Sequence, residues 1–246
     1  MEITSVNNEL VKETAKLQQK KYRKGKFLLE GYKAIKEAFD FGIEIEKVFV
    51  DKNHLKDYDF VKDLIIETTE PVLKKLSTTE SAPNAVAVGI QKTYDKNLLK
   101  SAKKVILLED IKDLGNLGTI IRTSVAFGAD AIVLYGESVD IYNPKCVRAS
   151  VGQLWKLPII EIKNFEELSE IFKTFERIAT LPRSNNLLKT FKANYPCLVM
   201  FGSEANGLSN ELINFSTNSV KIEMAQTVES LNLATSVAVV LYEIFI

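Results

Sequence analysis

Histidine is the scarcest functional residue of this chain, because its 246 residues include a single one, His54. Catalytic triads of the Ser-His-Asp or Cys-His kind and zinc sites of the HExxH kind all need histidine in a defined arrangement. His54 stands in the polar segment DKNHLKDYD, which is typical of a loop or the start of a solvated helix. We therefore expect His54 at the surface, and any reaction must depend on carboxylate, amide, hydroxyl, lysine or arginine groups.

Cysteines and long apolar runs are also scarce. The two cysteines, Cys146 and Cys197, lie far apart in apolar surroundings and lack a CxxC spacing, so we predict neither a disulfide nor a metal site. The most apolar run, SVAVVLY near the C-terminus, is much shorter than the ~20 residues that span a bilayer. The first residues, MEITSVNNEL, lack the pattern of a signal peptide. These features predict a cytoplasmic protein.

Net charge is absent as well, since 32 basic residues balance 32 acidic ones. The chain therefore lacks the overall positive field that would by itself indicate a nucleic-acid-binding protein. One segment near the N-terminus differs, because residues 16–26, which we call the basic arm, contain no acid. Its basic residues are Lys16, Lys20, Lys21, Arg23, Lys24 and Lys26. The basic arm is either a surface for RNA phosphates or an ordinary solvated face.

The spacing of apolar segments divides the chain into two halves. In the first half, the short apolar runs FLLE, KVFV, DLIIE and AVAVGI alternate with helix-like stretches such as YKAIKEAFDFG, which ends at a glycine. This pattern predicts a small α/β domain over residues 1–92. The polar, lysine-rich segment that follows predicts a linker over residues 93–104. Residues 105–246 form the second predicted domain.

The second half alternates strands and helices with greater regularity. The strand candidates are VILLE (105–109), AIVLY (131–135), LPIIEI (157–162), RIATL (177–181), CLVMF (197–201) and SVKIE (219–223). Helices are expected after Asn116, from Asn143, over NFEELSEIFKTF and from Ser230. Continuous apolar strands separated by helices predict a parallel sheet covered on both faces, in the doubly wound α/β class. Sheets of this class bind ligands at the carboxyl ends of their strands.

The loop after the first of these strands reads DIKDLGNLGTIIRTS. It has neither the GxGxxG pattern of a dinucleotide site nor the GK[ST] ending of a P-loop. Its glycines, Gly115 and Gly118, allow a tight turn and a close approach of the backbone to a partner, and Asn116 offers an amide between them. The apolar helix that follows carries a full positive charge at Arg122, which is either a site residue or half of a partly buried ion pair.

Two further loops place polar groups at the ends of apolar segments. In GSEANGLSNEL, Glu204 follows a buried strand almost directly and is either a helix cap or a site residue. In MAQTVESLNLATS, Ser230 and Asn232 stand at the head of an apolar helix, and either one could cap it. One cap suffices for one helix, so at least one of the two has no evident structural role.

Four blocks of the second half resemble, in order and spacing, those of a known enzyme family. The blocks are DLGNLGTIIRTSVAFGAD, YNPKCVRASVGQLWKLP, LVMFGSEANGLS and VKIEMAQTVESLNLATSVAVVLYE. The family is the SpoU/TrmH class of SPOUT RNA methyltransferases, which transfer a methyl group from S-adenosylmethionine to a ribose 2′-hydroxyl. The first half resembles the small α/β substrate-binding (RNA-binding) module that precedes the catalytic domain in many members. Leu114 and Glu223 stand where the family usually or often has proline.

The resemblance implies a fold and a set of site residues. The C-terminal segment is expected to thread through a loop as a deep trefoil knot, which is a rare exception among proteins. The implied catalytic residues are Asn116, Arg122, Glu204, Ser230 and Asn232. The implied cofactor-binding residues are Phe201, Gly202, Ile222, Met224 and Leu231, largely through backbone groups. The expected RNA-facing residues are Arg148 and, in the basic arm, Lys20, Lys21, Arg23 and Lys24. No metal is expected.

Arg122 is the general base in mechanisms drawn for this family, which conflicts with the very high pKa of arginine, ~12 or more. We prefer the hypothesis that Arg122 stays charged, grips a substrate phosphate and stabilises negative charge developing at the 2′-oxygen. The proton would then leave through water, Glu204 or the phosphate.

The resemblance also leaves functional alternatives. Ribosomal RNA is favoured over transfer RNA because the first domain looks like that of ribosomal RNA enzymes in the class. A ribosome-associated RNA-binding factor with an inactive cofactor pocket is a second possibility, and a SPOUT enzyme that methylates a base is a third, disfavoured by the quoted loops. We expect a homodimer, since family members build the RNA site across a two-fold interface.

Overall fold

A computed structural model describes residues 1–225, 227–228 and 230–246. The chain forms two compact units. The first consists of Met1–Lys92 together with Asp140–Trp155, and the second of Thr93–Val139 together with Lys156–Ile246. Asp140–Trp155 therefore packs with the N-terminal residues, although in the sequence it stands between two strands of the second unit.

The first unit is built on a five-stranded sheet with the order β1-β4-β3-β5-β2. Its strands include the four apolar runs expected from the sequence and a short additional strand at the N-terminus. They are β1 (Glu2–Ile3), β2 (Lys26–Glu30), β3 (Ile45–Asp51), β4 (Ile65–Thr68) and β5 (Ala85–Ile90). The helical segments are α1 (Glu9–Lys16), η1 (Lys20–Tyr22), α2 (Tyr32–Asp40), η2 (Lys52–Leu64), α3 (Glu70–Leu76), α5 (Pro144–Ala149) and η4 (Gln153–Trp155).

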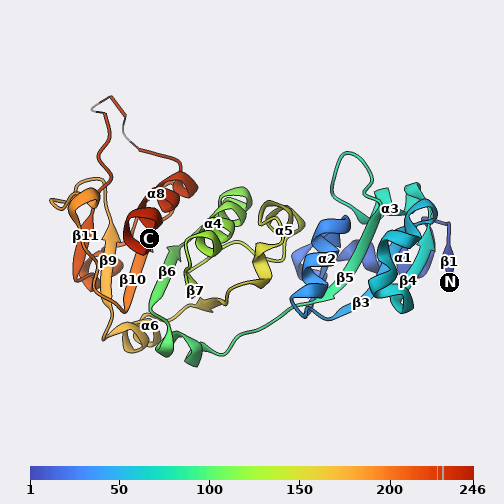
Figure 1. Cartoon of the computed structure of the whole chain (residues 1–246), viewed down its shortest axis with the longest axis horizontal. Helices are drawn as coiled ribbons and strands as arrows, with labels where there is room; N and C mark the ends of the chain where they lie inside the picture. The colour runs from blue at the N-terminus through green and yellow to red at the C-terminus, as the bar shows by residue number, and fades with distance from the viewer. Residues whose placement is uncertain (226, 229) are drawn as a thin grey trace. The chain divides into compact units, whose positions relative to one another are not determined.

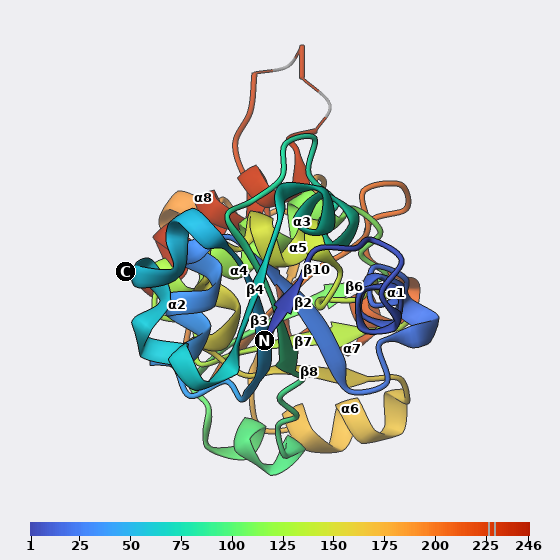
Figure 2. The same cartoon turned by 90° about the vertical axis from the view of Figure 1, so that its right-hand side faces the viewer.

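Helices cover both faces of this sheet. On one face, α1 and α3 pack against each other and against the strands, and their buried side chains include Val11 and Leu73, which join Leu28 and Phe49 in one core cluster. On the other side of the sheet lies α2, as Figure 2 shows. Side chains alternate along a strand, so Phe27 points away from Leu28. The ring of Phe27 packs against the rings of Tyr142 and Trp155, whose centroids lie 4.9 and 5.2 Å away.

The second unit contains a six-stranded sheet with the order β11-β9-β10-β6-β7-β8, in which every neighbouring pair is parallel (Figure 1). All six strands expected from the sequence are present. They are β6 (Lys104–Glu109), β7 (Ala131–Tyr135), β8 (Ile159–Ile162), β9 (Glu176–Thr180), β10 (Cys197–Phe201) and β11 (Asn218–Val220). The helical segments are η3 (Lys96–Ser101), α4 (Leu114–Ala126), α6 (Phe165–Phe172), η5 (Leu188–Thr190), α7 (Asn210–Phe215) and α8 (Leu233–Phe245).

This sheet is covered on both sides, as predicted for a doubly wound α/β fold. Leu168 and Phe172 of α6 and Leu212 of α7 join strand residues in one apolar cluster. The helices α4 and α8 pack against each other and lie on the other side of the sheet (Figures 1 and 2). Because the strands are parallel, their carboxyl ends meet at one edge, and the three loops singled out in the sequence begin at that edge. The threading of the C-terminal segment stays a prediction.

The scarce residues are placed as the sequence indicates. His54 is exposed and lies 3.0 Å from an oxygen of Asp57. Both cysteines are free and buried. Within the described ranges, no three His, Cys, Asp or Glu side chains are grouped so that they could hold a metal ion. None of the described helices is long and apolar enough to cross a lipid bilayer.

Candidate functional site

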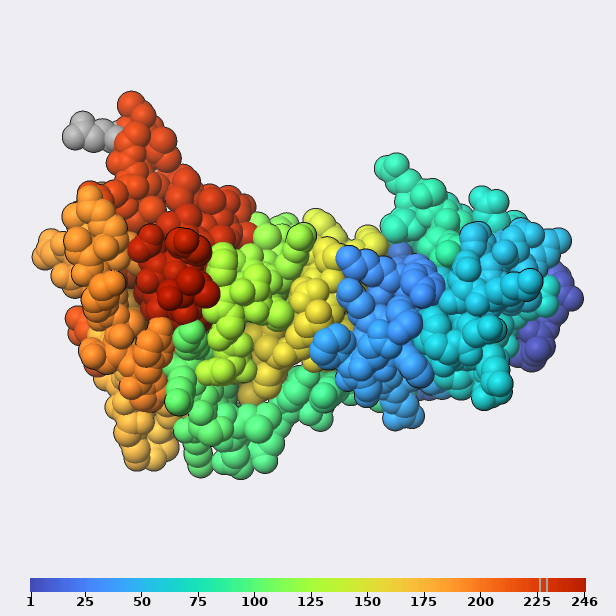
Figure 3. Space-filling view, viewed as in Figure 1, coloured from blue at the N-terminus to red at the C-terminus, as the bar shows by residue number. Residues whose placement is uncertain are grey.

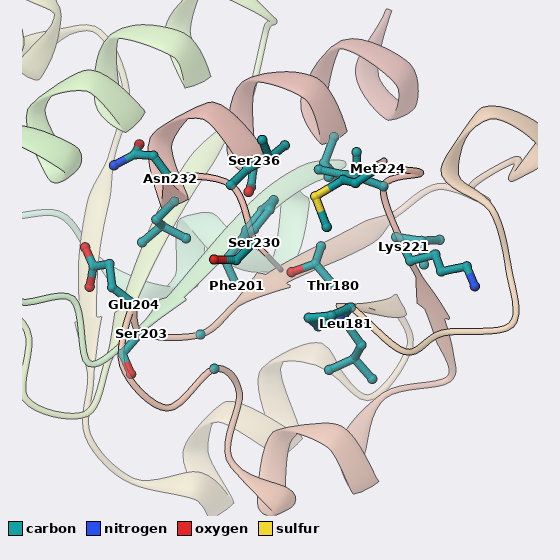
Figure 4. A pocket seen from close by; sticks show the side chains of 18 residues that line it. Thr180, Leu181, Phe201, Ser203, Glu204, Lys221, Met224, Ser230, Asn232 and Ser236 are labelled. Carbon is teal, nitrogen blue, oxygen red and sulfur yellow. The ribbon is translucent and has the colours of Figure 1, made fainter. Parts of the chain in front are cut away.

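A cavity of about 490 Å³ opens at the carboxyl edge of the second sheet. Its walls come from the ends of β9, β10 and β11 and from the start of α8. Figure 4 shows Glu204 and Asn232 at one end of the cavity, and Met224 and Lys221 at the other. The lining residues are Thr180, Leu181, Pro182, Phe201, Gly202, Ser203, Glu204, Gly207, Val220, Lys221, Ile222, Met224, Ser230, Leu231, Asn232, Leu233, Ser236 and Val240.

The predicted cofactor-binding residues all belong to this lining. Phe201 is the buried last residue of β10, and Gly202 opens the loop that follows it. Ile222, Met224 and Leu231 come from the chain between β11 and α8. The sequence predicted that these five residues share one site, and the structure brings them together, whereas their role in holding a cofactor stays a prediction.

The loop after β10 is a tight turn that depends on glycine. A Cβ atom on Gly202 would lie 1.9 Å from the carbonyl carbon of Gly207, so no larger residue fits without moving the backbone. The amide of Gly207, whose φ is +67°, donates a hydrogen bond of 2.9 Å to the carbonyl of Ser203. Just beyond the turn, the buried carboxylate of Glu109 accepts a hydrogen bond of 2.7 Å from the amide of Ser209. This anchor ties the loop to the end of β6.

Three predicted catalytic residues form one hydrogen-bonded chain at the mouth of the cavity. The side-chain amide of Asn116 donates to Glu204 Oε1 over 2.8 Å, and its carbonyl oxygen accepts from Asn232 Nδ2 over 3.0 Å. The orientation of both amides is fixed by their partners, because a carboxylate only accepts and the Asn232 oxygen accepts backbone N–H bonds. Residues separated by 88 and 116 positions in the sequence are thereby held in one geometry.

The helix caps decide two alternatives that the sequence left open. Asn232 caps α8, because its Oδ1 accepts from the amides of Ala234 and Thr235. Ser230 therefore has no capping role and lines the cavity. The helix after the Glu204 loop, α7, is capped by Ser209. Glu204 is consequently not a cap, and its carboxylate serves the chain of hydrogen bonds at the cavity.

Arg122 lies on the exposed side of α4, two residues before the buried Ser124. Among the described residues, no hydrogen bond or ion pair engages its guanidinium, so the alternative of a partly buried structural ion pair is not supported. It does not contribute to the cavity lining. The start of α4 is capped by Asp113, which accepts from the amide of Asn116 over 2.7 Å. The helix thus fixes the backbone of Asn116 and presents Arg122 to solvent.

Several lining residues were not anticipated. Thr180 is the last residue of β9, and Leu181 and Pro182 follow it. Thr180 Oγ1 donates to the carbonyl of Met200 over 2.8 Å. The rule that ligands bind at the carboxyl ends of parallel strands could have identified this segment. Lys221 and Ser236 had no comparable signal, since their approach to the cavity depends on how the chain packs.

Arg23 is placed differently from the prediction. It is 3% exposed, and its Nε donates to Asp140 over 2.9 Å while Nη1 donates to the carbonyls of Leu17 and Gln18. A guanidinium committed to these partners cannot reach a phosphate, so the expected RNA contact of Arg23 is wrong. The carbonyls it binds directly follow the last residue of α1, where free acceptors need donors.

The remaining expected RNA-facing residues differ in exposure. Lys20, Lys21 and Lys24 are exposed. Arg148 on α5 is partly exposed and is held by Glu30, with Nη1 3.1 Å from the carboxylate. Its role in RNA binding stays a prediction.

Comparison with known proteins relates this arrangement to enzymes. The SpoU rRNA Methylase family matches residues 103–242, and the MRM3-like substrate binding domain matches residues 8–87. An uncharacterised tRNA/rRNA methyltransferase of Synechocystis is 34% identical over 98% of this chain and 92% of its own length. The 23S rRNA (guanosine(2553)-2′-O)-methyltransferase of Bacillus subtilis is 26% identical over 99% of this chain and 98% of its own.

Solved structures agree with the sequence comparison. The AdoMet-bound rRNA methyltransferase from Sinorhizobium meliloti superposes with a TM-score of 0.89 at 28% identity, covering 99% of this chain and 96% of that one. The SpoU methyltransferase AviRb from Streptomyces viridochromogenes, in complex with AdoMet, superposes with a TM-score of 0.86 at 25% identity, covering 96% and 97%. Both the sequence match over the second sheet and these superpositions place the chain in the SpoU rRNA methylase family.

Proposed function

We propose that this protein is an RNA methyltransferase that uses S-adenosylmethionine to methylate a ribose 2′-hydroxyl of ribosomal RNA. The observation that carries this function is the cavity at the carboxyl edge of the parallel sheet, with Asn116, Glu204 and Asn232 hydrogen-bonded at its mouth. Family membership supports the reaction, and relatives that act on 23S rRNA support the substrate.

The cavity suits S-adenosylmethionine in size and in chemistry. Its volume of about 490 Å³ lies within the range of sites for small cofactors, ~300–1,000 Å³. Phe201, Leu231 and Val240 supply apolar walls for a purine, and Gly202 beside them contributes backbone groups that can read its edge. When bound, the cofactor supplies a methyl group on a cationic sulfonium, and the protein needs to add orientation and help with the hydroxyl proton.

The polar residues at the cavity mouth contribute to the reaction in different ways. The carboxylate of Glu204 is an acceptor for the ribose hydroxyl or for a water that takes its proton. Asn116 holds that carboxylate in place, and Asn232 holds Asn116, so the three act as a unit. Ser230, which is exposed and free of a capping role, offers a hydroxyl to the substrate or to the cofactor. Lys221 adds a positive charge elsewhere in the lining.

We assign to Arg122 the role of a charged clamp. A guanidinium stays protonated under physiological conditions and can bind a phosphate through two parallel hydrogen bonds. Its exposure on α4 leaves those donors available to an RNA backbone. From a substrate phosphate it would stabilise negative charge that develops at the neighbouring 2′-oxygen.

A second copy of the chain is the proposed partner besides RNA. The surface formed by α4 and α8, which lie side by side in Figure 3, exposes apolar side chains. Tyr242 is 58% exposed and packs edge-on against Phe127, which follows α4, with ring centroids 5.9 Å apart, and Val239 is 37% exposed. Pairing through this surface would bury these rings. Light scattering of the purified chain tests the dimer, and Tyr242→Glu should shift it to the monomer.

The proposed function is tested by two measurements. Titration with S-adenosylmethionine should show binding, which an RNA-binding factor with an inactive pocket would lack. Ribose-methylation mapping of RNA from cells with and without the gene should then reveal one lost 2′-O-methyl group. Its place in ribosomal or transfer RNA decides the substrate, and nucleoside mass spectrometry separates 2′-O from base methylation. Loss of a ribosomal methyl group would also fit the expected cytoplasmic location.

A further inference from the structure

An exposed aromatic ring lies among lysines on the first unit, within the basic arm. Tyr22 in η1 is 40% exposed. Lys21 Nζ lies 4.8 Å from the centre of its ring, and Lys16 Nζ lies 5.9 Å from it. Both distances fall within the ~6 Å of a cation–π interaction. An exposed ring combined with cations is the means by which proteins bind single-stranded nucleic acid, since every base has a face that can stack.

A cavity of about 290 Å³ opens next to this ring. Apolar side chains, among them Leu17 and Val88, contribute to its lining. The charged lining residues are Lys16, Lys24, Lys26, Lys47, Glu13 and Glu46. Lysines outnumber glutamates in that set, so the cavity attracts an anion. A pocket with apolar walls and a positive rim suits a nucleotide, whose base is flat and whose phosphate is charged.

Two lysines beside the ring keep their charge available. Glu46 pairs with both Lys26 and Lys47, and Glu13 pairs with Lys16. In the described part of the chain, no carboxylate forms an ion pair with Lys21 or Lys24. These two exposed ammonium groups are therefore the ones that a phosphate next to a stacked base would meet.

The backbone of the basic arm is rigidly held. The buried guanidinium of Arg23 fastens it to the end of α1 and to Asp140. Lys24 has a φ of +29° and Gly25 a φ of +83°, so the chain turns sharply back into β2. A left-handed conformation at a lysine is uncommon, and such outliers gather where a residue serves a function. Because the turn is already ordered, little conformational entropy would be lost when RNA binds.

We propose that this surface is a binding site for one unpaired RNA nucleotide, whose base stacks on Tyr22 and whose phosphate contacts Lys21 and Lys24. The proposal rests on the proposed function, in which the partner is RNA, and it specifies the form of RNA that the first unit recognises. A base inside an A-form duplex is already stacked on its neighbours and cannot reach a side chain. The site therefore selects a loop, bulge or single-stranded segment over a duplex.

The test uses the full chain and a short single-stranded oligoribonucleotide that contains the fluorescent base 2-aminopurine, with the corresponding duplex as comparison. Stacking on an aromatic ring quenches 2-aminopurine, whereas a contact with phosphate alone does not. The wild-type chain should quench the single strand and bind the duplex more weakly. Tyr22→Phe keeps the ring and should preserve the quenching. Tyr22→Ala should abolish it and raise the Kd about 10-fold.

Matched variants separate stacking from charge. Tyr32 is similarly exposed, at 43%, but belongs to α2 on the other side of the sheet, so Tyr32→Ala should leave binding and quenching as in the wild type. Lys21→Gln and Lys24→Gln should keep the quenching while each lowers the slope of log K against log salt by about 0.7. Circular dichroism of each variant verifies that the chain is folded.

Two results would overturn the proposal: undiminished quenching by folded Tyr22→Ala, or duplex binding as tight as that of the single strand. Binding of S-adenosylmethionine, measured on the same samples, distinguishes this failure from failure of the proposed function. A chain that binds the cofactor but is unaffected by Tyr22→Ala refutes the nucleotide site alone. A chain that quenches through Tyr22 but binds no cofactor refutes the proposed methyl transfer and leaves the nucleotide site standing.

Discussion

Replacement of Asn116 by aspartate tests the hydrogen-bonded chain at the cavity mouth most directly. The substitution keeps the shape of the side chain but replaces the donor to Glu204 with a second carboxylate. At the observed separation of 2.8 Å, two negative charges repel by about 1.5 kcal/mol in bulk water and by about 6 kcal/mol at an effective dielectric constant of about 20. Glu204 is exposed and can swing away, so we expect the lower value.

The consequences can be measured on stability and on activity. A loss of about 1.5 kcal/mol should lower the melting temperature of Asn116→Asp by about 4 °C. Methyl transfer should fall about 10-fold or more, because Glu204 is no longer held at the cavity.

A double variant separates the charge effect from general damage. When Asn116→Asp is combined with Glu204→Gln, the amide and the carboxylate exchange places. The carboxylate now at position 116 can accept hydrogen bonds from both the amide at position 204 and the amide of Asn232. Stability should return to the wild-type level, while activity stays low because the Glu204 carboxylate is gone. The proposed geometry is refuted if Asn116→Asp alone is as stable and as active as the wild type at neutral pH.

Four further predictions can each be tested by a single measurement. Gly202→Ala places a Cβ 1.9 Å from the backbone of Gly207 and should abolish binding of S-adenosylmethionine in calorimetry while the first unit stays folded. Arg122→Lys keeps the charge but loses the two-pronged donor geometry, so activity should fall at least about 10-fold, and near-normal activity would contradict the clamp. Gly152→Ala, at a φ of +73° and with its Cβ 1.1 Å from a buried carboxylate oxygen, should destabilise the chain by more than about 1 kcal/mol in urea denaturation. Burial raises the pKa of both cysteine thiols to about 12, so the thiolate is nearly absent at neutral pH and iodoacetamide should label them only after unfolding.

The basic arm illustrates how charge counted along the sequence can mislead. In the sequence, Arg23 is equivalent to the lysines around it, and all of them suggest contact with phosphate. In the fold, Arg23 turns inward to bind carbonyls at the end of α1 and Asp140, which lies far away in the sequence. Arg23 holds the backbone of the basic arm through these hydrogen bonds, while Lys21 and Lys24 are exposed. Arginine suits this task because its donors spread over several acceptors at once.

Leu114 and Glu223 stand where the family usually or often has proline, and the structure shows where each of them lies. Leu114 is the first residue of α4, whose N-terminal cap is Asp113, so the helix begins without the usual proline. Glu223 is exposed and pairs with Lys189 over 2.6 Å. Neither residue contributes to the cavity lining.

Local residue patterns were sufficient to predict the strands of the second unit, its helices α4, α6 and α8 and its polar loops. Apolar runs bounded by polar turns specify the strands, and Asn143, identified in the sequence as a helix cap, caps α5 because its side-chain oxygen accepts from a free amide. The continuous apolar character of the strands also indicated a parallel sheet, since both of its faces must be covered. These properties depend on residues close together in the chain, which is why the sequence alone specifies them.

Which polar groups meet at the site depends instead on the packing of distant segments. Asn116, Glu204 and Asn232 interact because β6 and β10 are neighbours and α8 returns to pack on α4, and no local pattern encodes that pairing. The same holds for the burial of Arg23 and for the packing of residues 140–155 with the first unit. Hydrogen bonds and ion pairs require approach to within about 3 Å, and for residues distant in sequence only the fold supplies that approach.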